Sequence, residues 1–255
     1  MRRVSELQIR EAIANFNYVG RLKDRRPYGS GHINDTFLLT FEIGDMGVIK
    51  VILQRMNGEI FNNPIDLMEN VVGVTAYLRE KIIENGGDPD RETLNTIPNK
   101  DGRSYYVDSK GDYWRSYKFI TDATSYDQVE KPEDFYESAV AFGNFQRLLA
   151  DYPAETLHET IKGFHDTRAR FQVFKEAVAK DVCGRAASVQ KEIDFVLARE
   201  DVANVFGELL DRGEIPLRVT HNDTKLNNIM IDNFTGKGIC VIDLDTVMPG
   251  LAMHD

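Results

Sequence analysis

The sequence contains few of the residues and runs that mark several common protein classes. It has 255 residues but only two cysteines, Cys183 and Cys240, which lie far apart and form no paired motif. A disulfide framework and a thiolate-bound metal site are therefore excluded, and the low cysteine content fits a reducing compartment. No stretch approaches the roughly 18 consecutive apolar residues that a membrane-spanning helix requires.

An excess of positive charge is absent as well. The formal net charge is −10 at pH 7, so bulk attraction to a polyanion such as nucleic acid is not expected. The opening stretch MRRVSELQIREAIANF lacks the apolar core of a secretory signal. We therefore expect a cytoplasmic protein with no nucleic-acid partner and no membrane partner. Any phosphate that it binds must be held locally, by backbone amides, a few cations or a metal ion.

The first half of the chain has the patterns of a small α+β unit. A serine that can act as N-cap precedes apolar residues at helical spacing, which predicts a short helix within 5–16. The runs 35–43 and 47–56 are rich in β-branched and aromatic residues and flank a glycine-containing turn, which indicates a β-hairpin. Between 62 and 87, a capping asparagine, a proline in the first turn and a closing glycine pair predict a helix. Short strands follow over 92–122.

Beyond residue 122 the pattern becomes helical. Apolar residues recur at helical spacing in three segments, which are 131–153, 169–181 and 188–214. The first of these carries an aromatic stripe that we expect in the core, formed by Phe135, Phe142 and Phe145.

Short strands return near the end of the sequence, at 217–221, 228–232 and 238–245. Because strands and helices are segregated along the chain, the fold class is α+β. We expect two lobes, a β-rich lobe over 1–121 and a helical lobe over 122–255.

The segment RVTHNDTKLNNIMID places polar residues at the mouth of an apolar strand. His221, Asp223 and Asn228 form the pattern H-x-D-x-x-x-x-N, and Asp243 ends the next apolar strand. A turn joins the two strands, so Asn228 and Asp243 are expected at the same end of a hairpin. A carboxylate and an amide oxygen suit Mg²⁺, which takes oxygen ligands and keeps waters that phosphates can replace. Asp223 lies beside this predicted metal site and can accept a proton from a hydroxyl that attacks phosphorus.

These groups fit phosphoryl transfer, which needs an orienting or basic carboxylate, a metal site and phosphate contacts. Protein kinases have H-R-D-x-x-x-x-N followed by D-F-G; here the first spacing matches and I-D-L-D replaces the second. The combination resembles the aminoglycoside and choline kinase-like phosphotransferases. Five blocks are similar to the N-acetylhexosamine 1-kinase group of that superfamily: YGSGHINDTF, ILQRMN, FNNPIDLMEN, VTHNDTKLNNIMID and VIDLDTVMPG.

The resemblance implies a two-lobed protein-kinase-like fold with a small β-rich N-lobe and a helical C-lobe. It implies ATP-dependent phosphorylation of the anomeric hydroxyl of a small-molecule sugar, N-acetylglucosamine or N-acetylgalactosamine. In this comparison Asp223 is the catalytic base, and Asn228 and Asp243 hold Mg²⁺.

The resemblance also implies a set of nucleotide contacts. The turn GSGHIN takes the place of the kinase glycine-rich loop, although its polar residues could instead reach the sugar. No lysine clearly takes the position of the kinase lysine on the second hairpin strand, so a glutamine or arginine there is implied near the phosphates. Glu69 on the following helix is the implied partner of that strand residue. The segment around Phe119 is the implied hinge between the lobes and would bind adenine through its backbone. The expected contacts are Gly29, Ser30, Gly31, Asn34, Gln54, Arg55, Glu69 and Phe119.

Several polar residues also have a structural interpretation. We favour a bracing role for His221 over proton transfer. Asp245 is equally open to a supporting role at the metal site and to helix capping. The run RLKDRRP, residues 21–27, is interpreted as a solvated charge cluster, and Cys240 as a thiol in the core.

Members of the resembling group continue past MPGLAMHD with further helices, so the resemblance implies that the C-lobe is truncated here. An uncovered apolar surface on this lobe predicts self-association.

Two other functions stay open. One is a kinase of the same fold that acts on an amino alcohol or an aminoglycoside, which a screen of neutral sugars against amines distinguishes. The other is a non-catalytic nucleotide-binding remnant, which would bind nucleotide without turnover.

Overall fold

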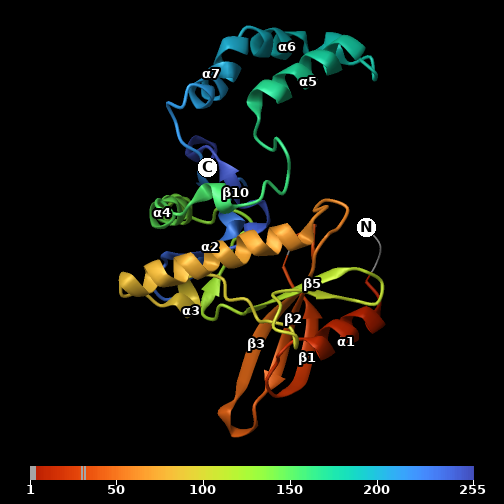
Figure 1. Ribbon diagram of the computed structural model, residues 1–255, viewed down its shortest axis with the longest axis vertical. Helices are drawn as coiled ribbons and strands as arrows, with labels where there is room; N and C mark the ends of the chain where they lie inside the picture. The colour runs from red at the N-terminus through yellow and green to blue at the C-terminus, as the bar shows by residue number, and fades with distance from the viewer. Residues whose placement is uncertain (1–3, 30, 32) are drawn as a thin grey trace.

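The structure, a computed structural model, describes residues 4–29, 31 and 33–255 and is a mixed α+β protein. Its largest sheet has five antiparallel strands in the order β1-β2-β3-β5-β4 (Figure 1). The expected hairpin forms its centre and begins at Asp35. The strands are β1 (Arg21–Pro27), β2 (Asp35–Glu42), β3 (Val48–Arg55), β4 (Tyr106–Val107) and β5 (Tyr113–Lys118).

One face of this sheet packs against the first helix. Ser5 caps α1 (Glu6–Asn15), as expected, with its side-chain oxygen accepting from the Gln8 amide. Strand residues alternate between the two faces, so every second residue of the central strands meets α1. The resulting core contains Ile9, Ala12, Phe16, Leu39, Val51, Leu53 and Trp114.

The opposite face of the five-stranded sheet packs into a larger core, which contains residues from both halves of the chain. Asn63 caps the long helix α2 (Pro64–Glu84), whose buried stripe was predicted from its spacing. The short helix α3 (Pro89–Glu92) follows it. Residues of the first half in this core include Leu67, Met68, Val71 and Tyr117, and those of the second half include Phe142, Phe145, Ile229, Leu244 and Val247.

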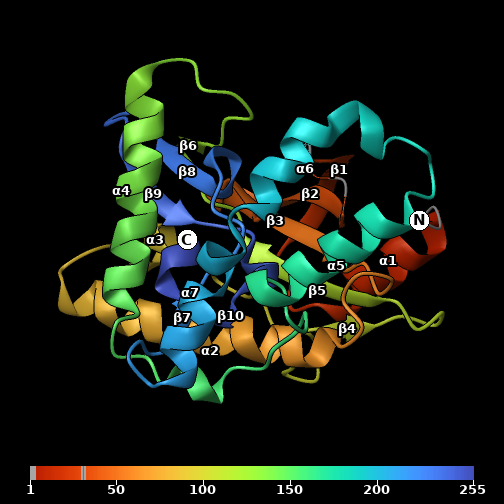
Figure 2. The ribbon, with the colours of Figure 1, turned by 90° about the horizontal axis from the view of Figure 1, so that it is seen from above.

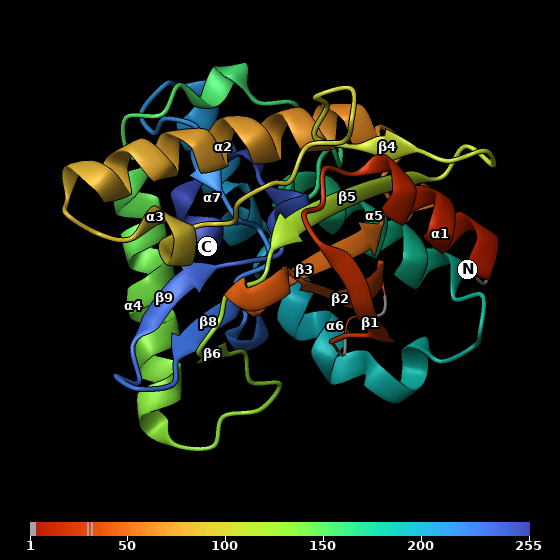
Figure 3. The same cartoon turned by 90° about the horizontal axis from the view of Figure 1, so that it is seen from below.

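The second half contributes two small antiparallel sheets, β6-β8-β9 and β10-β7. Helix α4 (Pro132–Leu148) lies along β8 and β9 in both views (Figures 2 and 3). A Cβ at Gly238 would lie 2.7 Å from the Glu137 carbonyl oxygen, so only glycine allows this approach. The strands are β6 (Ala123–Thr124), β7 (Arg218–Thr220), β8 (Ile229–Asp232), β9 (Gly238–Val241) and β10 (Met248–Gly250).

Three further helices lie at the end of the molecule opposite the five-stranded sheet (Figure 1). They are α5 (Thr167–Lys180), α6 (Gln190–Leu197) and α7 (Glu200–Asp211). Their exposed apolar residues include Val173, Phe195 and Val202, and self-association through this surface stays a prediction. Short 3₁₀ turns occupy Gly44–Met46, Ala154–Thr156, Ala186–Val189, Leu226–Asn228, Leu244–Thr246 and Ala252–His254.

Residues 21–27 form the edge strand β1, and their charged side chains are mostly exposed, as expected of a solvated cluster, and protect that edge. Two other expectations about this fold were wrong. The segment 188–214 is two helices, because the Arg199 side chain donates to the Phe195 carbonyl oxygen and ends α6. Phe135 is 66% exposed, so the buried face of α4 begins beyond its first turn.

No helix in the described ranges is long and apolar enough to cross a membrane.

The turn of the β8–β9 hairpin is organised by one carboxylate. Asp232 accepts hydrogen bonds from the Phe234 and Thr235 amides at 3.0 and 2.7 Å, and Arg91 binds its other oxygen at 2.8 Å. The Arg91 guanidinium, together with these donors, holds the pKa of Asp232 well below its usual range. Ionised Asp232 therefore stabilises the hairpin that carries the candidate site.

We predict that Asp232→Asn lowers the melting temperature at neutral pH. Because the folded-state pKa is depressed, the full stabilisation is present above the unfolded value of about 4, declines below it, and is lost as the pH falls through the depressed folded value. The difference between the melting temperatures of the two proteins, measured between pH 3 and 8, should therefore be constant near neutral pH and narrow toward the acidic end. Asp45→Asn, in the exposed β2–β3 turn, is the control, and a constant difference at all pH values would contradict the assignment.

Candidate active site

The loop between β7 and β8 is organised by a buried histidine. The His221 ring packs edge-on against Phe142 and Phe145, with centroids 5.3 and 6.0 Å away. Its Nε2 lies 3.0 Å from the Ile242 carbonyl oxygen, and its Nδ1 accepts from the Asp223 amide at 3.2 Å. This pattern requires the neutral tautomer protonated on Nε2, and burial lowers the pKa of His221 accordingly. The expected bracing role of His221 is confirmed.

A second brace comes from Asp255. Its two carboxylate oxygens accept from the His221 and Asn222 amides, both at 2.7 Å. Asn222 has a positive φ of 66°, and its side chain donates to the Thr246 carbonyl oxygen at 2.8 Å. The backbone immediately before Asp223 is therefore fixed on both sides.

Asp223 is held through one of its two carboxylate oxygens. Asn228 Nδ2 donates to Oδ2 at 3.0 Å, and Lys225 Nζ lies 2.7 Å from the same atom. Within the part of the chain that the structure describes, Oδ1 accepts no hydrogen bond, and 37% of the side chain is exposed. One oxygen is therefore fixed and the other is open to a reactant. Lys225 was missed by the sequence reasoning, although its place two residues after the aspartate in D-x-K was a usable signal.

The hairpin brings Asp243 to the same place. Ile229 pairs with Val241, and the Ile242 amide donates to the Asn228 carbonyl oxygen at 2.8 Å. Asp243 itself has a φ of 60°, and among the described residues nothing binds its solvent-accessible carboxylate. Desolvation by the surrounding protein, and then the negative charge of Asp245, raise the pKa of Asp243 to about 6. Asp223, Asn228 and Asp243 thus converge as the sequence predicted, while their chemical roles remain a prediction.

The donor set of this edge fits a hard divalent cation. Asp223 and Asp245 both act on Asp243 as like charges, which leaves an excess of negative charge beside an unbound carboxylate. Oxygen donors with excess negative charge are the environment that Mg²⁺ and Ca²⁺ prefer.

Comparison with known proteins places this geometry in a family. Residues 24–255 match the phosphotransferase enzyme family. The chain belongs to that family. The expected relationship at superfamily level is therefore correct, and the chain is a phosphotransferase of the kinase type by descent.

Three solved structures of phosphotransferases share its fold at TM-scores of 0.57 to 0.58. A spectinomycin phosphotransferase in complex with ADP and spectinomycin is 12% identical, with 98% of this chain and 71% of that chain covered. An amicoumacin kinase in complex with AMP-PNP and Ca²⁺ is 11% identical, with 98% and 66% covered. An aminoglycoside phosphotransferase from Alicyclobacillus acidocaldarius is 10% identical, with 99% and 69% covered. The protein-kinase-like fold is thereby confirmed, and this phosphotransferase spans about two thirds of the length of those chains.

The glycine turn of the phosphotransferase is only partly described, since Ser30 and His32 lie outside the described residues. Gly29 has a φ of +81°, and both Gly29 and Gly31 are exposed with open space around them. Asn34 points elsewhere, because its amide donates to Asp245 Oδ2 at 2.7 Å. The two glycines are thus free to approach a ligand, while Asn34 is engaged inside the protein.

Gln54 and Arg55 face opposite sides of the sheet, because successive strand residues alternate. Arg55 faces α1, where it pairs with Asp35 and Asp112 at 2.6 and 2.9 Å. Arg55 is therefore engaged on the α1 side of the sheet, and of the two candidates on this strand, Gln54 or Arg55, the one near the phosphates stays a prediction. Gln54 faces the other side and accepts from Arg115 Nε at 3.0 Å.

The buried arginine of the inner face was therefore missed. Arg115 is 1% exposed, and its guanidinium pairs with Asp245. It lies opposite Gln54 in the β3–β5 register, which no local pattern in the sequence shows.

Glu69 does not pair with a strand residue. Its carboxylate lies 2.7 Å from Nε2 of His158, on the loop after α4, and Asp66 lies 3.9 Å from the other ring nitrogen. The residue of α2 that turns inward is Asn70, whose amide donates to the His158 and Val247 carbonyl oxygens. In place of the implied strand cation, Glu69 therefore pairs with His158 in this structure.

Phe119 follows β5 at the predicted hinge. Its ring meets the Tyr28 ring edge-on at 5.6 Å, and Lys50 Nζ lies 5.6 Å above it. Its amide donates to the Lys50 carbonyl oxygen at 3.2 Å. The structure thus gathers the hinge, the residue before the glycine turn and the centre of β3 in one place.

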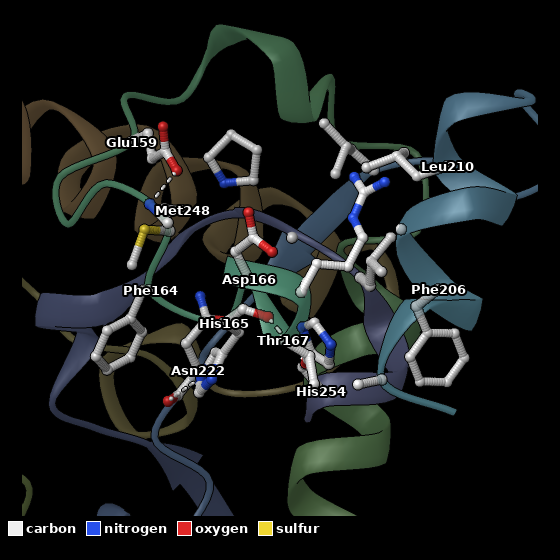
Figure 4. A pocket seen from close by; sticks show the side chains of 18 residues that line it. Glu159, Phe164, His165, Asp166, Thr167, Phe206, Leu210, Asn222, Met248 and His254 are labelled. Atoms are coloured by element: carbon white, nitrogen blue, oxygen red, sulfur yellow. Dashed lines mark hydrogen bonds between the residues drawn. The ribbon is translucent and has the colours of Figure 1, made fainter. Parts of the chain in front are cut away.

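A cavity of about 210 Å³ opens beside the loop between β7 and β8. Asn222, β10, the segment 159–168 and α7 line it (Figure 4). Its polar groups include Glu159, Asp166 and two histidines, and its apolar walls include Phe164, Phe206 and Leu210. His165 Nε2 lies 3.1 Å from the Asn222 carbonyl oxygen and joins this wall to the loop.

We predict that His221→Phe destabilises the protein by about 1–3 kcal/mol, because the ring fits but the buried Ile242 oxygen loses its donor. Urea denaturation measures this loss. The control is His158→Phe, which removes only a half-exposed contact and should cost about 1 kcal/mol or less. Equal losses in the two variants would show that the His221 hydrogen bonds are unimportant.

Proposed function

We propose that this phosphotransferase uses ATP to phosphorylate the anomeric hydroxyl of an N-acetylhexosamine. The observation that carries the proposal is the convergence of Asp223, Asn228 and Asp243, with one Asp223 oxygen left open. Family membership supports the reaction class. The sugar acceptor is supported by the blocks of sequence that are similar to N-acetylhexosamine 1-kinases.

Asp223 acts on the acceptor hydroxyl. Oδ2 is held by Asn228 and Lys225, so Oδ1 faces the reactant and accepts the hydroxyl proton. The freed oxygen forms a bond to the terminal phosphorus as the bond between that phosphorus and the bridging oxygen of ADP breaks. Orientation of the hydroxyl, rather than strong basicity, is the main contribution expected of this carboxylate.

The remaining groups bind the phosphates. Lys225 is half-exposed beside Asp223 and supplies a positive charge at the transferred group. Asn228 and Asp243 are assigned to Mg²⁺, which neutralises charge on the nucleotide phosphates when it is bound. Gly29 and Gly31 offer backbone amides, and Ser30 stays an untested member of the same turn.

We assign adenine to the hinge at Phe119, between the lobes 1–121 and 122–255. Tyr28 and Phe119 offer apolar ring surface there, while the backbone supplies directional contacts. The cavity beside Asn222 is assigned to the acceptor, because its mixture of rings, carboxylates and imidazoles suits a polyhydroxylated molecule.

A second candidate acceptor is a cationic amino alcohol or aminoglycoside. The carboxylates of Glu159 and Asp166 favour it, since Arg168 in the same wall is already paired with Asp211 at 2.6 Å. An ADP-release assay over free N-acetylhexosamines, other sugars and amine acceptors decides between the two. Turnover with amines alone would overturn the sugar assignment, and nucleotide binding without any turnover would favour a non-catalytic role.

We predict that Asp223→Asn lowers kcat by about 10²–10⁴-fold, because the amide cannot accept the proton. Nucleotide affinity, measured by calorimetry, should stay close to that of the unaltered protein. Asp45→Asn, in the exposed β2–β3 turn, is the control for a removed charge. Undiminished kcat in Asp223→Asn would refute the base assignment.

We predict a different signature for Asp243→Asn. Nucleotide binding in the presence of Mg²⁺ should weaken by about 10- to 100-fold, a loss typical even of groups that only support a metal ligand. Binding without Mg²⁺ should change little. Titration calorimetry with and without the ion separates these outcomes, and an equal loss under both conditions would place Asp243 outside the metal site.

A further inference from the structure

A buried ion pair joins the five-stranded sheet to the β8–β9 hairpin. Arg115 Nη1, on β5, lies 2.5 Å from Asp245 Oδ1, in the 3₁₀ turn after β9. The side chains are only 2% and 5% exposed. The pair therefore connects segments that are far apart in the sequence. Its acidic member, Asp245, lies two residues beyond Asp243.

Both partners are held by further contacts from the sheet side. Arg115 Nε donates to Gln54 Oε1 at 3.0 Å, and Gln54 in turn donates to Thr36 at 2.9 Å. The second oxygen of Asp245 accepts from Asn34 Nδ2 at 2.7 Å, and Asn34 accepts from the Asn57 amide at 3.0 Å. Both carboxylate oxygens of this hairpin residue are thus bound by groups of the first half.

Stability alone does not account for such a pair. Removing two charges from water costs several kcal/mol for each ion, and apolar replacements of buried pairs are often neutral or stabilising. What the pair adds is position, because Gln54 holds Arg115 Nε and Asn34 holds the other oxygen of Asp245, so the contact between them fixes where the turn lies against the sheet. Leu244, between Asp243 and Asp245, is 2% exposed in the core. With Leu244 buried, fixing Asp245 fixes the rotation of the turn and hence the direction of Asp243.

We infer that Arg115, with Asn34, acts as a strut on Asp245 that sets the spacing of the sheet from the hairpin and aims Asp243 at the nucleotide. Arg115 is thereby a positioning residue. The inference rests on the proposed function for its chemical consequence, but its mechanical part can be measured without activity.

The chemical test compares Arg115→Met, Asp245→Asn and the double variant. Each single change leaves a buried partner uncompensated and should lower the melting temperature, and the double variant should recover part of it. Turnover should behave differently: kcat should fall by about 10²-fold in all three variants, because Asp243 is misaligned. The KM of the acceptor should not change. Recovery of kcat together with stability in the double variant would show that the pair is merely structural.

The control is Arg91→Met with Asp232→Asn, which removes an ion pair at the other end of the same hairpin. It should lower the melting temperature and leave kcat unchanged. A comparable loss of kcat in this control would overturn the specific role of Arg115.

The mechanical test uses spin labels on cysteines introduced at the exposed positions Asp45 and Phe135, after Cys183→Ser. The label at residue 45 reports the position of the five-stranded sheet, and the label at residue 135 reports the position of α4. The distance distribution should broaden or shift in Arg115→Met and stay unchanged in the Arg91 control. An unaltered distribution would overturn the strut. If the distribution broadens in Arg115→Met but the unaltered protein binds no Mg²⁺ and ATP, the strut stands and the proposed function is refuted.

Discussion

One buried imidazole, that of His221, fixes the loop that carries Asp223 relative to the strand end that carries Asp243. His221 contacts the Ile242 carbonyl oxygen through Nε2 and the Asp223 amide through Nδ1, so a single ring fixes the residues next to both key carboxylates. Because the ring is fully buried, water cannot replace either contact, and a lost hydrogen bond would leave an unpaired polar group. The contact of Asn228 with Asp223 and the hairpin register operate within the frame that this ring sets.

Charge within that frame is concentrated and only partly compensated. Asp223, Asp243 and Asp245 lie close enough for their charges to interact, and two cations approach from different sides, Lys225 from the loop and Arg115 from the sheet. This arrangement explains how a chain with a net charge of −10 can be suited to phosphates. In the proposed function the carboxylates bind a divalent cation and the local cations bind the phosphate, so the overall charge has little influence on the site.

The sequence predicts those parts of the fold that local chemistry determines. Asn63 and Pro64 define the start of α2, and the motif around His221 identifies the brace, because each depends on neighbours within a few residues. The position of Arg115 could not be predicted from the sequence, because it depends on residues far away along the chain. Whether Arg55 or Arg115 meets the hairpin depends on strand alternation and on the pairing of β3 with β5, which joins segments about 60 residues apart. The break at Arg199 likewise depends on a side-chain contact with Phe195 that propensity does not encode.

The site is divided between rigid and adaptable parts. The groups assigned to phosphate chemistry lie on short strands and turns with buried neighbours, whereas the cavity beside Asn222 is lined by the segment 159–168 and by α7. Apart from His165, which contacts Asn222, residues of that segment and of α7 can be substituted to reshape the cavity without moving Asp223, which is held by Asn228 and by the His221 ring. In the proposed assignment, reaction class and acceptor choice therefore depend on different elements, and the same hairpin is compatible with acceptors as different as a neutral sugar and an amine.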